Sequence, residues 1–142
     1  MAIFVTALTN LTVDTDIMAA TDALGTKVGI TAPNRGIVRG IVLSDLDDDT
    51  FTCNVWFFTE EPTGIATNAV FTLADVDQER TQGVVLLPAS FDATNGQVRY
   101  SQSNVPYRTQ GGVLWLQCAL ATGTPTFAAA TDVKIRLYIE PY

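Results

Sequence analysis

The stretch 50–60, TFTCNVWFFTE, decides the fold class because its apolar residues recur at every second position. Successive side chains of a β-strand point to opposite faces of the sheet, so a period of two indicates a strand. One predicted face holds Phe51, Cys53, Val55 and Phe57. The other face holds Thr52, Asn54, Trp56 and Phe58. The first face is suited to a core, and the second is partly polar.

Two further stretches repeat this alternation. In 111–123, GGVLWLQCALATG, the inward residues would be Leu114, Leu116, Cys118 and Leu120. In 132–140, DVKIRLYIE, they would be Val133, Ile135, Leu137 and Ile139, with charged residues and a tyrosine between them. Alternation of apolar and polar residues is typical of antiparallel strands that have one buried face.

The rest of the chain is also rich in short strand patterns. Further strands are predicted at 2–8, 26–30, 35–44, 66–72 and 83–89, and at 91–94 and 97–100. The last two flank Asn95-Gly96, a pair that favours a hairpin with a two-residue type I′ turn. Only 73–82, LADVDQERTQ, indicates a helix.

These patterns predict an all-β fold. The length of 142 residues fits one domain, and no internal repeat or linker divides it. We therefore expect a single-domain antiparallel β-sandwich over residues 1–142, with a jelly roll as the more specific topology.

The composition argues against an enzyme. The chain has no histidine, which removes Ser-His-Asp and Cys-His nucleophile activation and the common zinc ligand sets. It also lacks the glycine-rich motifs that bind phosphates and dinucleotides. Glu60 and Glu61 are adjacent beside Pro62, which is typical of a solvated loop rather than of a glycosidase pair. We predict no catalytic, cofactor-binding or metal-binding residues.

Charge and hydropathy limit the partners. The net charge is −7, and the eight basic residues are spread along the chain, so nucleic acid is not expected as a partner. No apolar stretch approaches the roughly 20 residues of a membrane helix. The N-terminus lacks the basic residue and cleavage pattern of a signal peptide. We expect a soluble protein that is made in a cytoplasm and does not bind membranes.

Cys53 and Cys118 both lie in apolar strand patterns. A reduced, buried thiol behaves there as a small apolar group, and this is the interpretation that a cytoplasmic protein favours. A disulfide is the alternative.

The stretch 43–51, LSDLDDDTF, holds four aspartates within five positions. Asp45, Asp47 and Asp49 have the spacing with which an EF-hand loop begins, but Thr50 replaces the glycine of position six and Trp56 the glutamate of position twelve. The mismatches favour a polar turn between two strands over a calcium site.

Trp56, Phe58 and Trp115 are expected on outward strand faces and therefore need cover. The cover can be a loop of the same chain, a neighbouring subunit or a bound sugar, since aromatic faces serve all three. These three residues are the candidate interface.

Three stretches carry a resemblance: RGIVRGIVLSDLDDDTFTCNVWFF, AVFTLADVDQERTQGVVLLPASF and LWLQCALATGTPTFAAATDVKIRLYIEPY. Together they resemble small virion proteins of tailed bacteriophages over about residues 35–142, and residues 1–34 lie outside the match. The resemblance implies a decoration or cement protein on the capsid surface of the virion, with the major capsid protein as its partner. A lattice partner and the uncovered aromatics also predict a homo-oligomer, namely a trimer. The rival is a carbohydrate-binding or receptor-binding module in which Trp56, Trp115 or Tyr107 stacks on sugar rings.

Overall fold

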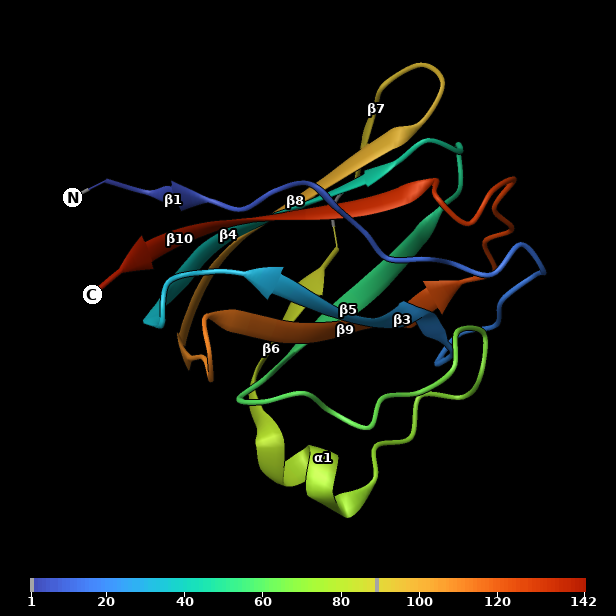
Figure 1. The fold of residues 1–142 in the computed structure, drawn as a ribbon. Coiled ribbons are helices and arrows are strands. Elements are labelled where there is room, and N and C mark those ends of the chain that lie inside the picture. The colour runs from blue at the N-terminus through green and yellow to red at the C-terminus, as the bar shows by residue number, and fades with distance from the viewer. Residues whose placement is uncertain (1, 89) are drawn as a thin grey trace.

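The computed structural model describes residues 2–88 and 90–142. Two antiparallel sheets pack face to face, and one short helix lies at the end of the molecule opposite β7 (Figure 1). The elements in chain order are β1 (Phe4–Val5), β2 (Thr9–Asn10), β3 (Ala23–Thr31), β4 (Arg35–Asp45), β5 (Phe51–Phe58), α1 (Asp75–Arg80), β6 (Thr81–Leu87), β7 (Ser90–Asp92), β8 (Gln97–Arg108), β9 (Val113–Gly123) and β10 (Val133–Pro141).

The large sheet has the strand order β1-β10-β4-β8-β7, and β2 pairs with β10 as well. The small sheet has the order β3-β9-β5-β6. Every pairing of named strands is antiparallel. The prediction of an all-β antiparallel sandwich is therefore confirmed, whereas the jelly-roll topology stays a prediction.

The core lies between the two sheets and is built from the alternating residues that the sequence indicates. The inward residues of β5, β9 and β10 are all buried: Phe51, Cys53, Val55, Phe57, Leu114, Leu116, Cys118, Leu120, Val133, Ile135, Leu137 and Ile139. They belong to one hydrophobic cluster that joins both sheets. Burial of a large apolar side chain contributes about 1.5–3 kcal/mol, so this cluster is the main stabilising element of the fold.

The N-terminal segment closes one side of the sandwich. The backbone N–H of Leu11 donates to the carbonyl of Val133 on β10 (3.0 Å), and the N–H of Thr26 on β3 donates to the carbonyl of Leu11 (2.9 Å). Leu11, Val13 and Met18 are buried in the core cluster. Residues 2–34 thus contribute strands and core to the same sandwich as the rest of the chain.

The side chain of Gln82 links the sheets on the opposite side. Its Nε2 donates to the carbonyls of Phe58 (2.9 Å) and Arg108 (3.2 Å), and its Oε1 accepts from the Arg108 N–H (3.0 Å). The neighbouring residue is Gly83, where a Cβ would lie 2.4 Å from Val105 Cγ1. Glycine permits β6 to approach β8 this closely.

Several predicted elements were wrong in extent or type. Within 2–8 only β1 (Phe4–Val5) is a strand, and β2 follows it. The helix at 73–82 is reduced to α1, because β6 begins at Thr81, and the strand predicted at 97–100 continues to Arg108 as β8. The predicted strand at 66–72 is a loop with one isolated bridge, between Asp22 and Val70. This segment has the alternation of a strand but pairs with the chain at only a few points, so no ladder forms.

The predicted type I′ turn was also wrong. Asp92 pairs with Gln97, so the loop of this hairpin has four residues, 93–96. Positive φ occurs at Thr94 (77°) and not at the Asn-Gly pair. A Cβ on Gly96 would lie 2.4 Å from the carbonyl oxygen of Asp45, so this glycine serves close packing between two turns.

Candidate functional site

The outer face of the small sheet is partly covered by the loop 59–74 and by α1 (Figure 1). The half of the loop that follows β5 is held by Asp77 of α1, which is buried. The carboxylate of Asp77 accepts hydrogen bonds from the backbone N–H groups of Thr63 (2.8 Å) and Gly64 (3.2 Å). Arg80 ion-pairs with Asp77 (3.7 Å) and Glu60 (2.9 Å).

The middle of the same loop is anchored by Gln117 on β9. Its Oε1 accepts from the Ile65 N–H (3.1 Å), and its Nε2 donates to the carbonyls of Ile65 (2.7 Å) and Gly25 (3.2 Å). The side chain is fully buried because the loop covers it. Sequence reasoning placed Gln117 on the outward face but gave it no role. An uncharged amide in an otherwise apolar strand was the available signal.

The three candidate interface aromatics have different environments. Phe58 is 1% exposed, although it is not part of the hydrophobic cluster between the sheets, so other segments of the chain cover it. Trp115 is half-buried, and the Nζ of Lys27 lies 5.9 Å from its ring centroid. The cover of Phe58 is therefore intrachain, whereas Trp56 and Trp115 remain partly accessible.

Trp56 is half-buried and packs against Phe71 of the loop, with ring centroids 5.5 Å apart and an interplanar angle of 39°. Both rings line two hollows. The larger, of about 480 Å³, is also lined by Thr72, Leu73, Gln78 and Thr81. The smaller, of about 350 Å³, is also lined by Thr21, Asn54, Ala119, Leu120 and Ala121. The structure does not add Tyr107 to this site, since that side chain is buried and its hydroxyl donates to the carbonyl of Pro33 (3.0 Å).

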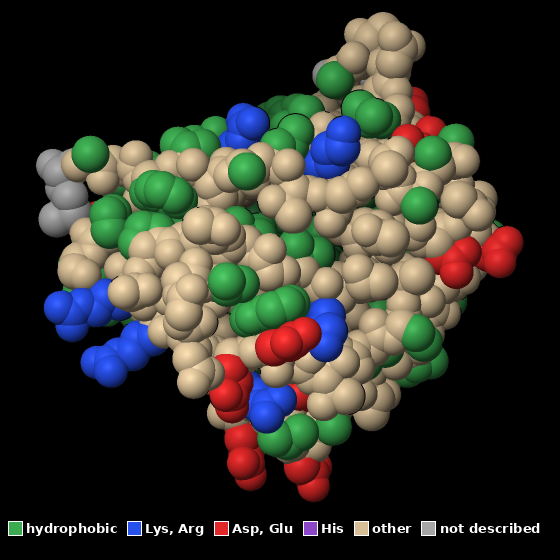
Figure 2. Space-filling model, in the orientation of Figure 1, with side chains coloured by type: hydrophobic (Ala, Val, Ile, Leu, Met, Phe, Trp, Pro, Cys, Tyr) green, Lys and Arg blue, Asp and Glu red, His purple; other side chains and the backbone are tan. Residues whose placement is uncertain are grey.

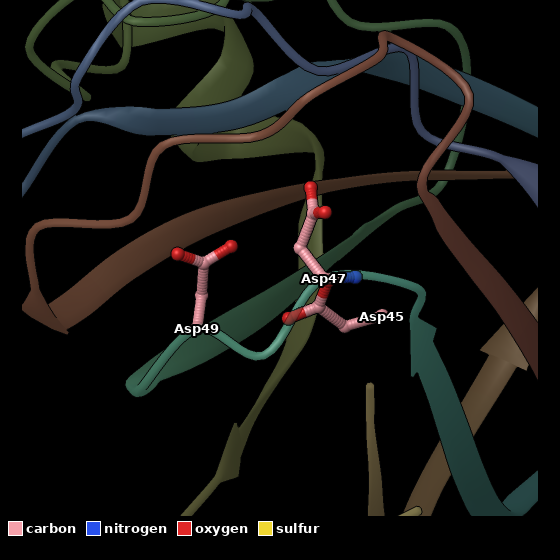
Figure 3. A group of neighbouring side chains, drawn as sticks. All are labelled: Asp45, Asp47 and Asp49. Carbon is pink, nitrogen blue, oxygen red and sulfur yellow. The ribbon is translucent and has the colours of Figure 1, made fainter. Parts of the chain in front are cut away.

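Asp45, Asp47 and Asp49 come together at the turn between β4 and β5 (Figure 3). One carboxylate oxygen from each lies within 4.8 Å of the others. The carboxylates hold backbone: Asp45 Oδ1 accepts from the Asp47 N–H (2.9 Å), Asp47 Oδ2 from the Ala128 N–H (2.8 Å) and Asp49 Oδ1 from the Thr126 N–H (3.4 Å). The aspartates thus shape their own turn and tether the loop before β10.

The counter-charge of this cluster is Arg99 of β8, which is fully buried. Its Nη1 lies 3.6 Å from Asp45 Oδ2, and Nε and Nη2 donate to the carbonyls of Phe51 (3.1 Å) and Asp49 (2.9 Å). The guanidinium carbon is 3.6 Å from the ring centroid of Phe51. A divalent cation at the three aspartates would therefore lie close to a fixed positive charge. Sequence reasoning missed Arg99, because nothing near it in the sequence marks it as buried.

Burial dominates the electrostatics of this cluster. It raises the pKa of Asp45 to about 7, although the hydrogen bond from the Asp47 N–H and the charge of Arg99 act in the opposite direction. Burial also raises the pKa of Asp49 and lowers that of Arg99. A buried carboxyl resists ionisation even beside an arginine when its hydration is lost.

The two cysteines are free and buried, as predicted. Burial raises the pKa of the Cys53 thiol to about 12 and that of Cys118 well above its usual range. Neither thiol is suited to act as a nucleophile, because the reactive form is the thiolate.

The outer face of the large sheet is a second candidate surface. We call it the basic face and define it by Val5, Arg39, Val42, Tyr100, Lys134, Arg136 and Tyr138. Arg136 pairs with Val42, which pairs with Tyr100, and Tyr138 pairs with Val5, so the side chains adjoin across four strands. Val5 is 47% exposed and Tyr100 is 40% exposed.

Charge is unevenly distributed over the molecule. Among the described residues of β4, β8 and β10, Asp45 is buried, and Glu140 is the one other carboxylate, ion-paired with Arg39 (2.6 Å). Figure 2 shows Lys and Arg side chains beside hydrophobic ones along the upper edge of the molecule, whereas Asp and Glu side chains gather mainly below, near α1, and at the right. The basic face is thus locally cationic on a chain with a net charge of −7.

Comparison with models of protein families and with curated protein sequences gives no match. Among the described residues, no helix is long and apolar enough to cross a membrane.

Proposed function

We propose that the protein is a structural virion component, a decoration or cement protein that binds the outer face of a tailed-bacteriophage capsid. The resemblance of residues 35–142 to small virion proteins of tailed phages supports this role. The observation that carries it is the basic face, a sheet surface on which exposed apolar side chains lie beside half-buried cationic ones. A sheet face of this kind favours burial against another surface.

The charge of the basic face specifies the kind of partner surface. Lys134 and Arg136 lie on it, and the half-buried carboxylate of Glu140, on the same strand, is already paired with Arg39. An acidic patch on the major capsid protein would complement these cations and would speed encounter. A second copy presenting the same face would bring like charges together, which disfavours a dimer that buries two basic faces.

A trimer extends this proposal. Decoration proteins must stay bound rather than turn over, and a closed ring of three copies would present three basic faces to a local threefold axis. Each further contact then forms at a high effective concentration, so weak single contacts suffice. Trp115, which is half-buried and lines neither of the hollows beside Trp56, remains the candidate residue for contacts between copies.

The test is co-sedimentation of the protein with capsids of the encoding phage that lack it. The double variant Lys134→Glu/Arg136→Glu should weaken binding at least about tenfold, because two repulsive charges replace two attractive ones. The matched control, Lys134→Arg/Arg136→Lys, keeps both charges and should bind as the wild type does. Light scattering at several concentrations tests the trimer.

Two results would contradict different parts of the proposal. A wild type that does not co-sediment with capsids at any salt concentration would exclude the decoration role. Wild-type binding that the double glutamate variant retains would leave the role standing and exclude the basic face as the docking surface.

A further inference from the structure

We propose that the two hollows beside Trp56 and Phe71 form one binding groove for a neutral saccharide. Both rings line both hollows, so a chain of sugar rings could run from one hollow to the other across the aromatic pair. The larger hollow, at about 480 Å³, is within the usual range of small-ligand sites, roughly 300–1,000 Å³. We call this surface the aromatic groove.

The lining of the aromatic groove selects the chemistry of the ligand. No ionisable side chain is among the described residues that line either hollow, so an ionic ligand would find no counter-charge. The polar groups are the amides of Asn54 and Gln78 and the hydroxyls of Thr21, Thr72 and Thr81. A saccharide matches both parts, because its C–H face packs on aromatic rings and its hydroxyls exchange hydrogen bonds with amides and hydroxyls.

Trp56 adds an unsatisfied donor. Its indole Nε1 is shielded from solvent and has no hydrogen-bond acceptor among the described residues. A buried donor without an acceptor is unfavourable, so a small shift of the surrounding side chains that lets an oxygen reach Nε1 is favoured. A saccharide hydroxyl that enters beside Phe71 would supply that oxygen.

The groove is held in place by the chain itself. The N–H of Phe71 donates to the carbonyl of Thr21 (2.8 Å), which fixes the loop against the start of β3. Gln117 anchors the same loop at Ile65, and Asp77 anchors it at Thr63. A preformed site loses less conformational entropy when a ligand binds, so few contacts can give measurable affinity.

The aromatic groove lies on the small sheet, whereas the basic face lies on the large sheet, and the two outer faces of a sandwich point away from each other. Saccharide binding is therefore independent of the docking that we propose for the basic face. A protein bound to a capsid by its basic face would keep the groove open to a glycan on a cell surface.

The test is binding to neutral hexasaccharides. Maltohexaose, cellohexaose, laminarihexaose, mannohexaose and chitohexaose are titrated against the free protein by calorimetry and by ¹H–¹⁵N NMR. The chain has two tryptophans, so the spectrum holds two indole N–H signals, and Trp115→Phe assigns them. We expect at least one oligosaccharide to bind and to shift the Trp56 indole signal.

Variants separate the groove from general surface binding. Trp56→Ala and Phe71→Ala should each weaken binding at least tenfold, and Gln78→Ala, on the exposed helix surface, should weaken it without unfolding risk. Trp115→Phe is the control and should bind as the wild type does, because Trp115 lines neither hollow. Absence of binding to all five oligosaccharides, binding only to the anionic probe heparin, or binding that survives both alanine variants of the aromatic pair would overturn the proposal.

Discussion

Asp45 should make the protein less stable as the pH rises from about 4 to about 7. Burial raises the pKa of this carboxyl from 3.8 to about 7 in the folded protein, whereas the unfolded chain keeps the ordinary value. Between these two values the unfolded state releases a proton that the folded state retains. Rising pH therefore favours unfolding, and the full penalty is present above the folded pKa.

The size of the effect follows from the pKa difference. A span of about three pH units at about 1.36 kcal/mol each gives an upper bound of about 4 kcal/mol. The pKa of about 7 already includes the charge of Arg99, and structural relaxation reduces the penalty further, so we expect roughly 2–4 kcal/mol. A small domain is stable by about 5–15 kcal/mol, and the loss is therefore measurable.

The variant that isolates this carboxyl is Asp45→Asn. Its side-chain oxygen can still accept the Asp47 N–H, as Oδ1 does in the wild type, but it cannot titrate. We expect equal stability of variant and wild type near pH 4, and a variant more stable by the amount above at pH 8. Asp16→Asn, at an exposed position, is the control and should follow the wild-type curve.

Urea unfolding followed by circular dichroism from pH 4 to pH 8, with EDTA throughout, measures both curves. The difference between them removes the contribution of the other carboxyls, including Asp49, whose pKa is also raised. If Asp45→Asn is instead the less stable protein at pH 8, the ion pair with Arg99 outweighs the burial of the carboxyl, and the reasoning fails.

Three further predictions concern ions, thiols and packing. The melting temperature should not change on addition of EDTA or of roughly 1 mM calcium, because Arg99 already supplies a cation to the aspartate cluster. A rise of several degrees with calcium would contradict this. Cys53 and Cys118 should react slowly with a thiol reagent in the native protein and rapidly after denaturation, and fast native labelling of both would refute their burial. Gly83→Ala should destabilise the fold by about 1–3 kcal/mol in chemical denaturation, since the new methyl group would meet Val105 Cγ1 at 2.4 Å; unchanged stability would show that β6 and β8 can separate without cost.

The sequence by itself determined the strands and the inward faces of the central ones. The alternation in β5, β9 and β10 predicted the buried residues correctly, because the two-residue period of a strand is set by its own backbone. The same pattern at 66–72 did not form a strand, because a strand also needs a partner along its length. Phe58 is buried outside the core cluster, so its cover comes from the folded chain and not from the strand period.

Only the tertiary structure decided which polar residues are buried. The burial of Arg99 and Gln117 depends on hydrogen-bond partners, Phe51 and Ile65, that lie about 50 residues away in the chain. A polar side chain can be buried only where such partners are already in place, and the fold brings them there.

In the candidate site, too, one part was predictable from the sequence and another part depends on the tertiary structure. The sequence identified Trp56 as an aromatic residue in need of cover, because its neighbours on β5 fix the direction of its side chain. Its partner Phe71 and the two hollows beside the pair depend on where the loop 59–74 crosses the small sheet. That path is set by Gln117 and Asp77, through hydrogen bonds to loop backbone that no periodicity in the sequence records.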